Sequence, residues 1–341
     1  MSSPTDFPDS FGDPRGEYQA ARQGAALFTL PSAIHVQLTG RDRAKFLHNF
    51  CTNDVRGLAT GKGCEAFVTN VQGKVLSHLF IQAFPDSLRL VALAGSAEKL
   101  VAHLSRYQIT EDVEFADRSS ELATLYVAGP LAPELVAGIL PQAPPASNLE
   151  GSEFPVLNST IAVIRNNFLA LPGYFLVTPR SAVEALQTEL IAGMARPAGR
   201  SAFDALRIEA GFPLYGTDIT DANLAQEVSR TSQAISFTKG CYLGQEPIAR
   251  IDALGHVNQE LRGLRLVADP IPAPGTEVIT TDESARVIGR ITSAARSYAD
   301  DRPVALALLR RGFETPGLAV AVRSDTTPVA GQVFWATKGG D

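Results

Sequence analysis

The sequence predicts an α+β fold that ends in a small β-barrel, and two patterns carry this prediction. Over about the first 258 residues, strand-like apolar runs and helix-like periodic segments follow one another without a steady β–α–β alternation. After Gln259 the helical signal disappears. Short apolar runs then recur between turn residues such as Ala273-Pro274-Gly275, which is typical of a small all-β unit.

The first block contains the elements of a mixed sheet. Gly73 fits a turn between two of its strands, Ser96 fits a helix N-cap, and Ser181 with Glu184 fits a capping box. Strands are expected at 34–38, 65–69, 75–84, 88–92, 125–128, 161–164 and 174–177, and helices near 46–50, 97–107, 131–139 and 183–190.

The last block supplies the strands of the predicted barrel, which are expected at 264–267, 277–280, 287–292, 304–309, 318–322 and 332–335. We therefore divide the chain into three parts. Residues 1–20, rich in Ser, Pro, Asp and Gly, form a disordered tail. Residues 21–258 form an α+β region of two intertwined subdomains, one centred on about 50–125, and residues 259–338 form the barrel.

Composition excludes several classes of protein. Of the 341 residues, 45% are hydrophobic and 19% are charged, which fits a globular protein and not a disordered one. The net charge of −6 gives no global attraction to nucleic acid or to an anionic membrane. No signal peptide and no bilayer-spanning apolar run is visible, so a cytoplasmic location is expected.

The three cysteines, Cys51, Cys64 and Cys241, are too few and too far apart for a disulfide framework or a cysteine metal site. Cys51 and Cys64 are expected to be core thiols, and no bound metal is expected.

The most informative segment is Lys239-Gly240-Cys241-Tyr242-Leu243-Gly244-Gln245-Glu246. Pro247 suits the first turn of a helix. A cysteine just ahead of a helix N-terminus and near a lysine has its thiolate stabilised by dipole and cation, so this pattern indicates a reactive thiol. The alternative is that Cys241 is a small buried hydrophobe and Lys239 is solvated.

This segment, with Arg250 after it, resembles the signature of the YgfZ branch of folate-binding proteins related to the glycine-cleavage T-protein. Residues 206–219 resemble a segment shared with the T-protein. Residues 36–47 and 52–55 resemble its opening motifs. The resemblance runs from roughly residue 25 to the end.

The resemblance implies a ring of three domains around a central hole that binds tetrahydrofolate, with the barrel as the third domain. It also implies support of iron–sulfur cluster assembly or repair, with iron–sulfur enzymes (including tRNA-modifying ones) or assembly proteins as partners. The catalytic candidates are Cys241 and Lys239. The ligand-binding candidates are Gly240, Tyr242, Gly244, Gln245, Glu246, Arg250, Asn53 and Asp218.

Some residues depart from the T-protein pattern. Where T-proteins carry an Asp-Asp pair, this chain has Ser77-His78, and Leu171 and Phe203 replace a pterin-binding Glu and an Arg. These departures weaken the folate prediction, and we do not expect a true aminomethyltransferase. His78 suits acid–base chemistry at neutral pH, although a histidine in a strand is more often packed.

Three hypotheses therefore compete: an accessory protein for cluster assembly, a T-protein-like aminomethyltransferase, and a binding module that has lost the folate site. Several candidate residues also have simpler interpretations. Tyr242 could pack against a neighbouring domain, Arg250 could pair with Glu246 on a helix, and Asn53 and Asp218 could serve turns.

Overall fold

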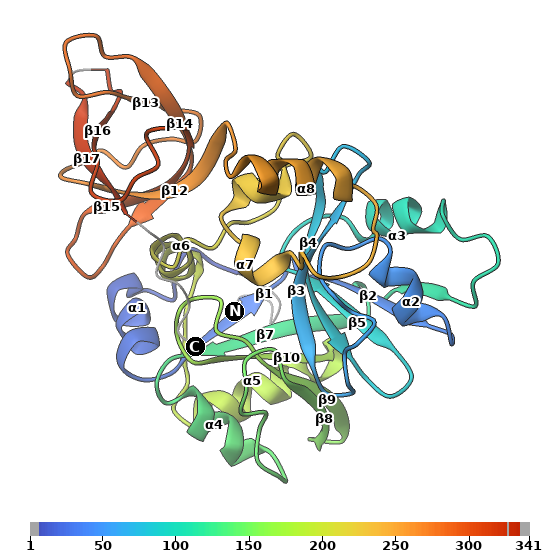
Figure 1. The fold of residues 1–341 in the computed structure, drawn as a ribbon. Coiled ribbons are helices and arrows are strands. Elements are labelled where there is room, and N and C mark those ends of the chain that lie inside the picture. The colour runs from blue at the N-terminus through green and yellow to red at the C-terminus, as the bar shows by residue number, and fades with distance from the viewer. Residues whose placement is uncertain (1–6, 326, 335–341) are drawn as a thin grey trace.

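The computed structural model describes residues 7–325 and 327–334, which form two sheets with covering helices and a barrel set to one side (Figure 1). One sheet has the strand order β3-β4-β5-β2-β6 and the other β11-β1-β7-β10-β9-β8, and the C-terminal strands form a closed barrel. The predicted α+β class with a C-terminal β-barrel is confirmed.

The five-stranded sheet carries two helices on one face. Apolar residues from alternate strand positions pack there against α2 and α3, as expected when one face of a sheet is buried. The predicted N-cap of α3 is confirmed, because Ser96 Oγ accepts a hydrogen bond from Lys99 N at 3.2 Å. The elements are α2 (Arg43–His48), α3 (Ala97–Ser105), β2 (Ile34–Thr39), β3 (Gly63–Thr69), β4 (Val75–Ala83), β5 (Leu88–Ala92) and β6 (Glu114–Asp117).

The six-stranded sheet is covered on its outer face by α4 and α5 (Figure 1). The predicted capping box of Ser181 and Glu184 is wrong. Ser181 lies inside a 3₁₀ turn before α5, and no side chain caps either element. The elements are β1 (Ala26–Leu30), β7 (Leu122–Ala128), β8 (Gly151–Val156), β9 (Ser159–Arg165), β10 (Gly173–Pro179), β11 (Arg196–Pro197), α4 (Ala132–Ile139), η1 (Arg180–Ala182) and α5 (Val183–Ala192).

Part of the expected disordered tail of residues 1–20 is instead helical, because α1 (Pro14–Gln23) begins within it, while residues 1–6 lie outside the described residues. Asp13 caps this helix by accepting a hydrogen bond from Gly16 N at 3.0 Å. Glu17 is fully buried, and its Oε2 accepts from Gly199 N at 2.9 Å, just ahead of α6 (Arg200–Glu209). Contacts with a segment far along the chain therefore order this region.

A cluster of aromatic rings fills the space between the two sheets. It takes residues from β1, β4, β7 and β10 and from the loop after β9, and α6 and the loop after it add two more rings. Ring centroids lie 4.6–6.5 Å apart in the pairs formed by these residues, a range that favours tilted and offset contacts. The rings are Phe28, Phe80, Tyr126, Phe168, Phe175, Phe203 and Phe212.

The chain between α6 and the barrel forms short helices beside β3 and β4 (Figure 1). A β-bridge between Lys74 and Leu224 joins this stretch to the five-stranded sheet. Its helices are η2 (Ala225–Val228), α7 (Thr231–Ala234) and α8 (Gln245–Leu254), so Pro247 lies in the first turn of α8 as predicted.

The barrel closes through six strands in the order β12-β15-β14-β13-β16-β17. All six predicted strands are present, although Trp335, which was expected to end the last one, lies outside the described residues. The strands are β12 (Gln259–Leu266), β13 (Glu277–Ile279), β14 (Val287–Arg296), β15 (Pro303–Arg310), β16 (Ala319–Val322) and β17 (Val329–Phe334).

Candidate functional site

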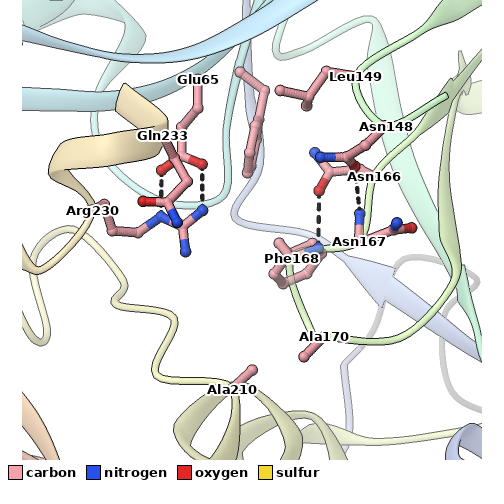
Figure 2. A pocket seen from close by; sticks show the side chains of 11 residues that line it. Glu65, Asn148, Leu149, Asn166, Asn167, Phe168, Ala170, Ala210, Arg230 and Gln233 are labelled. Atoms are coloured by element: carbon pink, nitrogen blue, oxygen red, sulfur yellow. Dashed lines mark hydrogen bonds and ion pairs between the residues drawn. The ribbon is translucent and has the colours of Figure 1, made fainter. Parts of the chain in front are cut away.

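A polar pocket opens beside the aromatic cluster, between β3, α7 and the loops before β8 and after β9 (Figure 2). Its volume is about 240 Å³, slightly below the range of about 300 Å³ and above that is usual for ligand pockets. This space suits one flat ring system better than a whole cofactor. The lining residues are Glu65, Phe80, Asn148, Leu149, Asn166, Asn167, Phe168, Ala170, Ala210, Arg230 and Gln233.

Glu65 and Arg230 form the charged wall of the pocket. Arg230 approaches through two nitrogens, with Nε 2.5 Å from Glu65 Oε1 and Nη2 2.5 Å from Oε2. The Glu65 side chain is only 3% exposed, so this bidentate pair is shielded from water. Burial alone would raise the pKa of Glu65, but the Arg230 charge and hydrogen bonds from Arg230 and His78 lower it to about 2. Glu65 is therefore an anion at neutral pH.

His78 reaches the same carboxylate from the neighbouring strand. In the β3–β4 register Glu65 lies opposite Phe80 and Phe67 lies opposite His78, so Glu65 and His78 are diagonal neighbours on one face. His78 Nε2 lies 2.7 Å from Glu65 Oε1. The imidazole also stacks on Phe212, with ring centroids 5.3 Å apart. His78 is thus a packed histidine that contacts the Glu65 carboxylate, and it does not line the pocket.

The opposite wall is formed by asparagines on the loop before β8 and on the loop after β9 (Figure 2). Asn148 Oδ1 accepts from Asn167 N at 3.0 Å, and Asn166 Oδ1 accepts from Phe168 N at 3.1 Å. Asn166 is 2% exposed, and its Nδ2 has no hydrogen-bond partner among the described residues. A buried side-chain amide donor without a hydrogen-bond partner is uncommon in folded proteins.

A second cavity of about 310 Å³ lies on another side of the aromatic cluster. Phe203 and Arg200 line it, together with Ala94. Leu171 packs against the aromatic cluster, and neither Leu171 nor Phe203 lines the pocket of Glu65 and Arg230. Leu171 and Phe203 stand where T-proteins carry polar residues, but this gives no argument against a ligand in that pocket. The expected weakening of the folate prediction is not supported.

Lys239 is buried and anchors the segment that carries Cys241. Its Nζ donates to three backbone oxygens, those of His48 at 2.6 Å and of Cys51 and Asn53 at 2.8 Å. Burial lowers the pKa of Lys239. The alternative in which Lys239 is solvated is wrong, because its ammonium is buried and already bound by carbonyl groups. Activation of the Cys241 thiol by this cation stays a prediction.

Cys241 is exposed, whereas Cys51 is buried and Cys64 is partly buried. Burial raises the pKa of Cys51 to about 11 and also raises that of Cys64. Gly244 shapes the chain after Cys241, because its φ is +84° and a Cβ there would lie 2.4 Å from Asn70 O. Glycine is required at that position.

Tyr242 and Asp218, both expected to bind a ligand, are committed to the fold. Tyr242 is buried in a small apolar cluster, with its ring 4.9 Å from Lys239 Nζ. Asp218 has no exposed side-chain area. Its Oδ2 accepts from Arg207 at 2.8 Å, and its Oδ1 accepts from Thr292 and Ser293 of the barrel. The geometry therefore supports a structural role for both residues.

Asn53 joins the two candidate sites. Its Nδ2 donates to Glu65 O at 2.8 Å and to Gln233 O at 3.0 Å, and its carbonyl accepts from Lys239. Asn53 therefore positions the pocket wall and the Cys241 segment together instead of presenting its amide to a ligand.

The remaining predicted residues lie on or beside α8. Gly240 and Glu246 are exposed and Gln245 is half-buried, so they stay available to a partner or ligand. Arg250 is exposed as well, and the alternative role, an ion pair with Glu246, is absent from the ion pairs of the described residues. The ligand-binding roles of these residues stay predictions.

The pocket residues Glu65, Arg230 and Asn166 were missed by the sequence reasoning. One signal was present for Glu65, because a carboxylate inside an apolar strand needs a buried partner. Arg230 and Asn166 come from distant loops, and no local pattern marks either of them. Within the described residues, no group of three or more His, Cys, Asp or Glu side chains could hold a metal ion. No helix in the described ranges is long and apolar enough to cross a membrane.

Two sheets around an aromatic core, a polar pocket beside that core and an appended barrel define a T-protein-like class of α+β protein. Residues 1–238 match the family model described as GCVT N-terminal domain. Residues 259–336 match the one described as glycine cleavage T-protein C-terminal barrel domain. Because the first match covers more than half of the chain, the protein belongs to the GCVT N-terminal domain family.

Several similar proteins are named aminomethyltransferase. An aminomethyltransferase of Herpetosiphon aurantiacus is 28% identical over 330 residues, which is 96% of this chain and 90% of that protein. An aminomethyltransferase of Bordetella avium is 36% identical over 63% of this chain and 60% of its own length. The crystal structure of glycine cleavage system aminomethyltransferase T from Bartonella henselae has a TM-score of 0.86. It is 21% identical and covers 98% of this chain and 91% of that one, so it shows the shared fold.

These comparisons correct one expectation from the sequence. We expected that the chain is not a true aminomethyltransferase, and relatives of that name that align with nearly the whole chain overturn this view. The coarser resemblance, to folate-binding proteins of the T-protein type, is confirmed by both family matches.

Proposed function

We propose that the chain is a tetrahydrofolate-dependent aminomethyltransferase that holds the reacting ring of the folate in the pocket of Glu65 and Arg230. The observation that carries the proposal is a carboxylate fixed as an anion in the wall of a ring-sized pocket. The names of the relatives support the same reaction.

The proposed reaction transfers a carbon between a carrier protein and the folate. The CH₂ of the carrier's aminomethyl group loses its bonds to the amine and to the carrier and forms bonds to two folate nitrogens. Of the two hydrogens displaced from those nitrogens, one completes the ammonia and the other takes the place of the CH₂ on the carrier. Loss of ammonia from an aminomethyl carbon develops positive charge there. A preorganised anion such as Glu65 stabilises that charge, because Arg230 and His78 hold the carboxylate in place.

The test is formation of methylenetetrahydrofolate from an aminomethylated carrier protein, with the wild-type chain and with Glu65→Gln. Turnover by the wild type and a loss of about 10²-fold or more in the variant support the proposal, since that is the usual size of one electrostatic contribution. No turnover with a carrier that is active with another aminomethyltransferase overturns it.

A second candidate function is support of iron–sulfur cluster assembly through Cys241. The observation in its favour is the exposed thiol within the Lys239–Glu246 signature, whereas Cys51 is buried and Cys64 is partly buried. We expect Cys241→Ala to lower the activity of cluster-dependent enzymes in cells that rely on this chain. Cys64→Ala is the matched control and leaves that activity unchanged. Equal activity with wild type and Cys241→Ala excludes this function for the thiol.

A further inference from the structure

The pocket presents hydrogen-bond donors on two facing walls. Figure 2 shows Arg230 on the side of Glu65 and Asn166 across the pocket from them. The carboxylate of Glu65 is occupied on both oxygens, by His78 and Arg230, so it has little capacity left to accept from a ligand.

Asn166 offers the more informative donor. Its Oδ1 accepts from Phe168 N, which fixes the amide so that Nδ2 is the free atom. Its backbone is held as well, because its carbonyl accepts from Tyr126 Oη at 2.8 Å and its N–H donates to Gly173 O at 2.8 Å. A rigid, buried and unpaired donor carries a free-energy cost, which an acceptor from a ligand would remove.

Arg230 supplies the donor on the facing wall. Nε and Nη2 bind Glu65, and Nη1 has no partner among the described residues. The guanidinium also lies over the Phe212 ring, with 5.2 Å between Arg230 Cζ and the ring centroid. The ion pair with Glu65 and this ring contact together hold Nη1 at the pocket.

We infer that Asn166 is a specificity-determining residue that binds the 4-carbonyl edge of a pteridine ring, with Arg230 as a second donor to the same ring. This inference rests on the proposed folate site and adds which edge of the ring is recognised. The 4-oxo group of folic acid is an acceptor and pairs with Asn166 Nδ2. A 4-amino group in its place is a donor and would face another donor.

The inference predicts a ligand preference that one substitution reverses. By calorimetric titration, the wild type binds folic acid about tenfold or more tightly than 4-aminofolic acid (aminopterin). Asn166→Asp keeps the Oδ1 acceptor for Phe168 N and replaces the donor with an acceptor, so it favours 4-aminofolic acid. Asn158→Asp adds the same charge in the exposed turn between β8 and β9, at a position that does not line the pocket, and retains the wild-type order.

The outcomes separate the inference from the function on which it rests. If tetrahydrofolate and folic acid both fail to bind the wild type, the proposed function and the inference both fall. If the wild type binds folates without preferring the 4-oxo form, or if Asn166→Asp keeps the wild-type order, only the inference falls. Because the ligand preference of the wild type is measured independently of any variant, the inference can be overturned even if Asn166→Asp folds poorly.

Discussion

At the residue scale, buried titratable groups couple stability to pH. Burial and the nearby Arg180 lower the pKa of His35 to about 4, and His35 Nε2 lies 3.1 Å from Thr124 Oγ1. As pH falls, the unfolded chain protonates this histidine first, so His35 destabilises the fold between its ordinary value of 6.5 and about 4. Glu65 has a lowered pKa, so the stability it contributes is present above about 4.5 and is lost toward about 2.

We therefore expect the free energy of unfolding to fall by on the order of 3 kcal/mol as pH drops from 6.5 to about 4, through His35 alone. His35→Gln retains a hydrogen bond to Thr124 without a titrating ring, so its stability depends less on pH in this window. Urea unfolding across the window measures both slopes. Equal slopes for the variant and the wild type would contradict the role given to His35.

The candidate site also shows which of its residues could be predicted from the sequence. Cys241 was found because its neighbours form a local pattern, and the structure shows its thiol exposed. Glu65, Asn166 and Arg230 lie more than 60 positions apart along the chain, and only the folded sheets bring them to one pocket. Local sequence patterns do not show that residues far apart in the chain will line one pocket.

At the scale of elements, the turn at Gly244 determines where the Cys241 segment enters α8. Gly244 has φ +84° and a Cβ there would lie 2.4 Å from Asn70 O, whereas Gly255 has φ +71° with open space around it. Both positions carry the cost of a left-handed residue, but only the first adds a steric clash with backbone.

We expect Gly244→Ala to lower the free energy of unfolding by about 1–3 kcal/mol more than Gly255→Ala does. Because the clash pushes the chain away from the β3–β4 turn, Gly244→Ala should also change the rate at which Cys241 reacts with a thiol reagent. Denaturant unfolding and timed labelling measure the two effects. Matching results for the two variants would refute this account of the turn.

Elements were predictable where one side of a strand or helix is apolar. The barrel strands and the β3–β4 hairpin follow from short apolar runs and turn glycines, and α3 follows from its N-cap and apolar face. By contrast, α1 was missed because its helical state depends on Glu17 contacting Gly199 in a distant segment. Polar composition predicted disorder there, and a tertiary contact outweighed it.

At the scale of the whole molecule, Asp218 connects the body to the barrel. Its carboxylate is shared by Arg207 of α6 and by Thr292 and Ser293 of β14, and its side chain has no exposed area. Arg207 also pairs with Asp204, at 2.6 Å, but the Asp204 side chain is 27% exposed. The Arg207 guanidinium thus has a buried partner in Asp218 and a partly solvated partner in Asp204.

We expect Asp218→Asn to cost about 3–5 kcal/mol, since it leaves the buried Arg207 charge without its main partner. Asp204→Asn is the matched control and should cost about 1 kcal/mol or less. The first variant should also speed amide exchange along β14, because the barrel loses its anchor. Thermal unfolding with hydrogen exchange tests this, and similar costs for the two variants would rule out the anchoring role.

The central claim is that the pocket of Glu65 and Arg230, and not the second cavity, binds tetrahydrofolate. Ala210 lines the first cavity and Ala94 lines the second, so each can be filled by a leucine side chain. The most direct measurement is calorimetric titration of tetrahydrofolate into the wild type, Ala210→Leu and Ala94→Leu. We predict micromolar binding to the wild type and to Ala94→Leu, and loss of binding with Ala210→Leu. No binding to the wild type, or binding that survives Ala210→Leu, would contradict the claim.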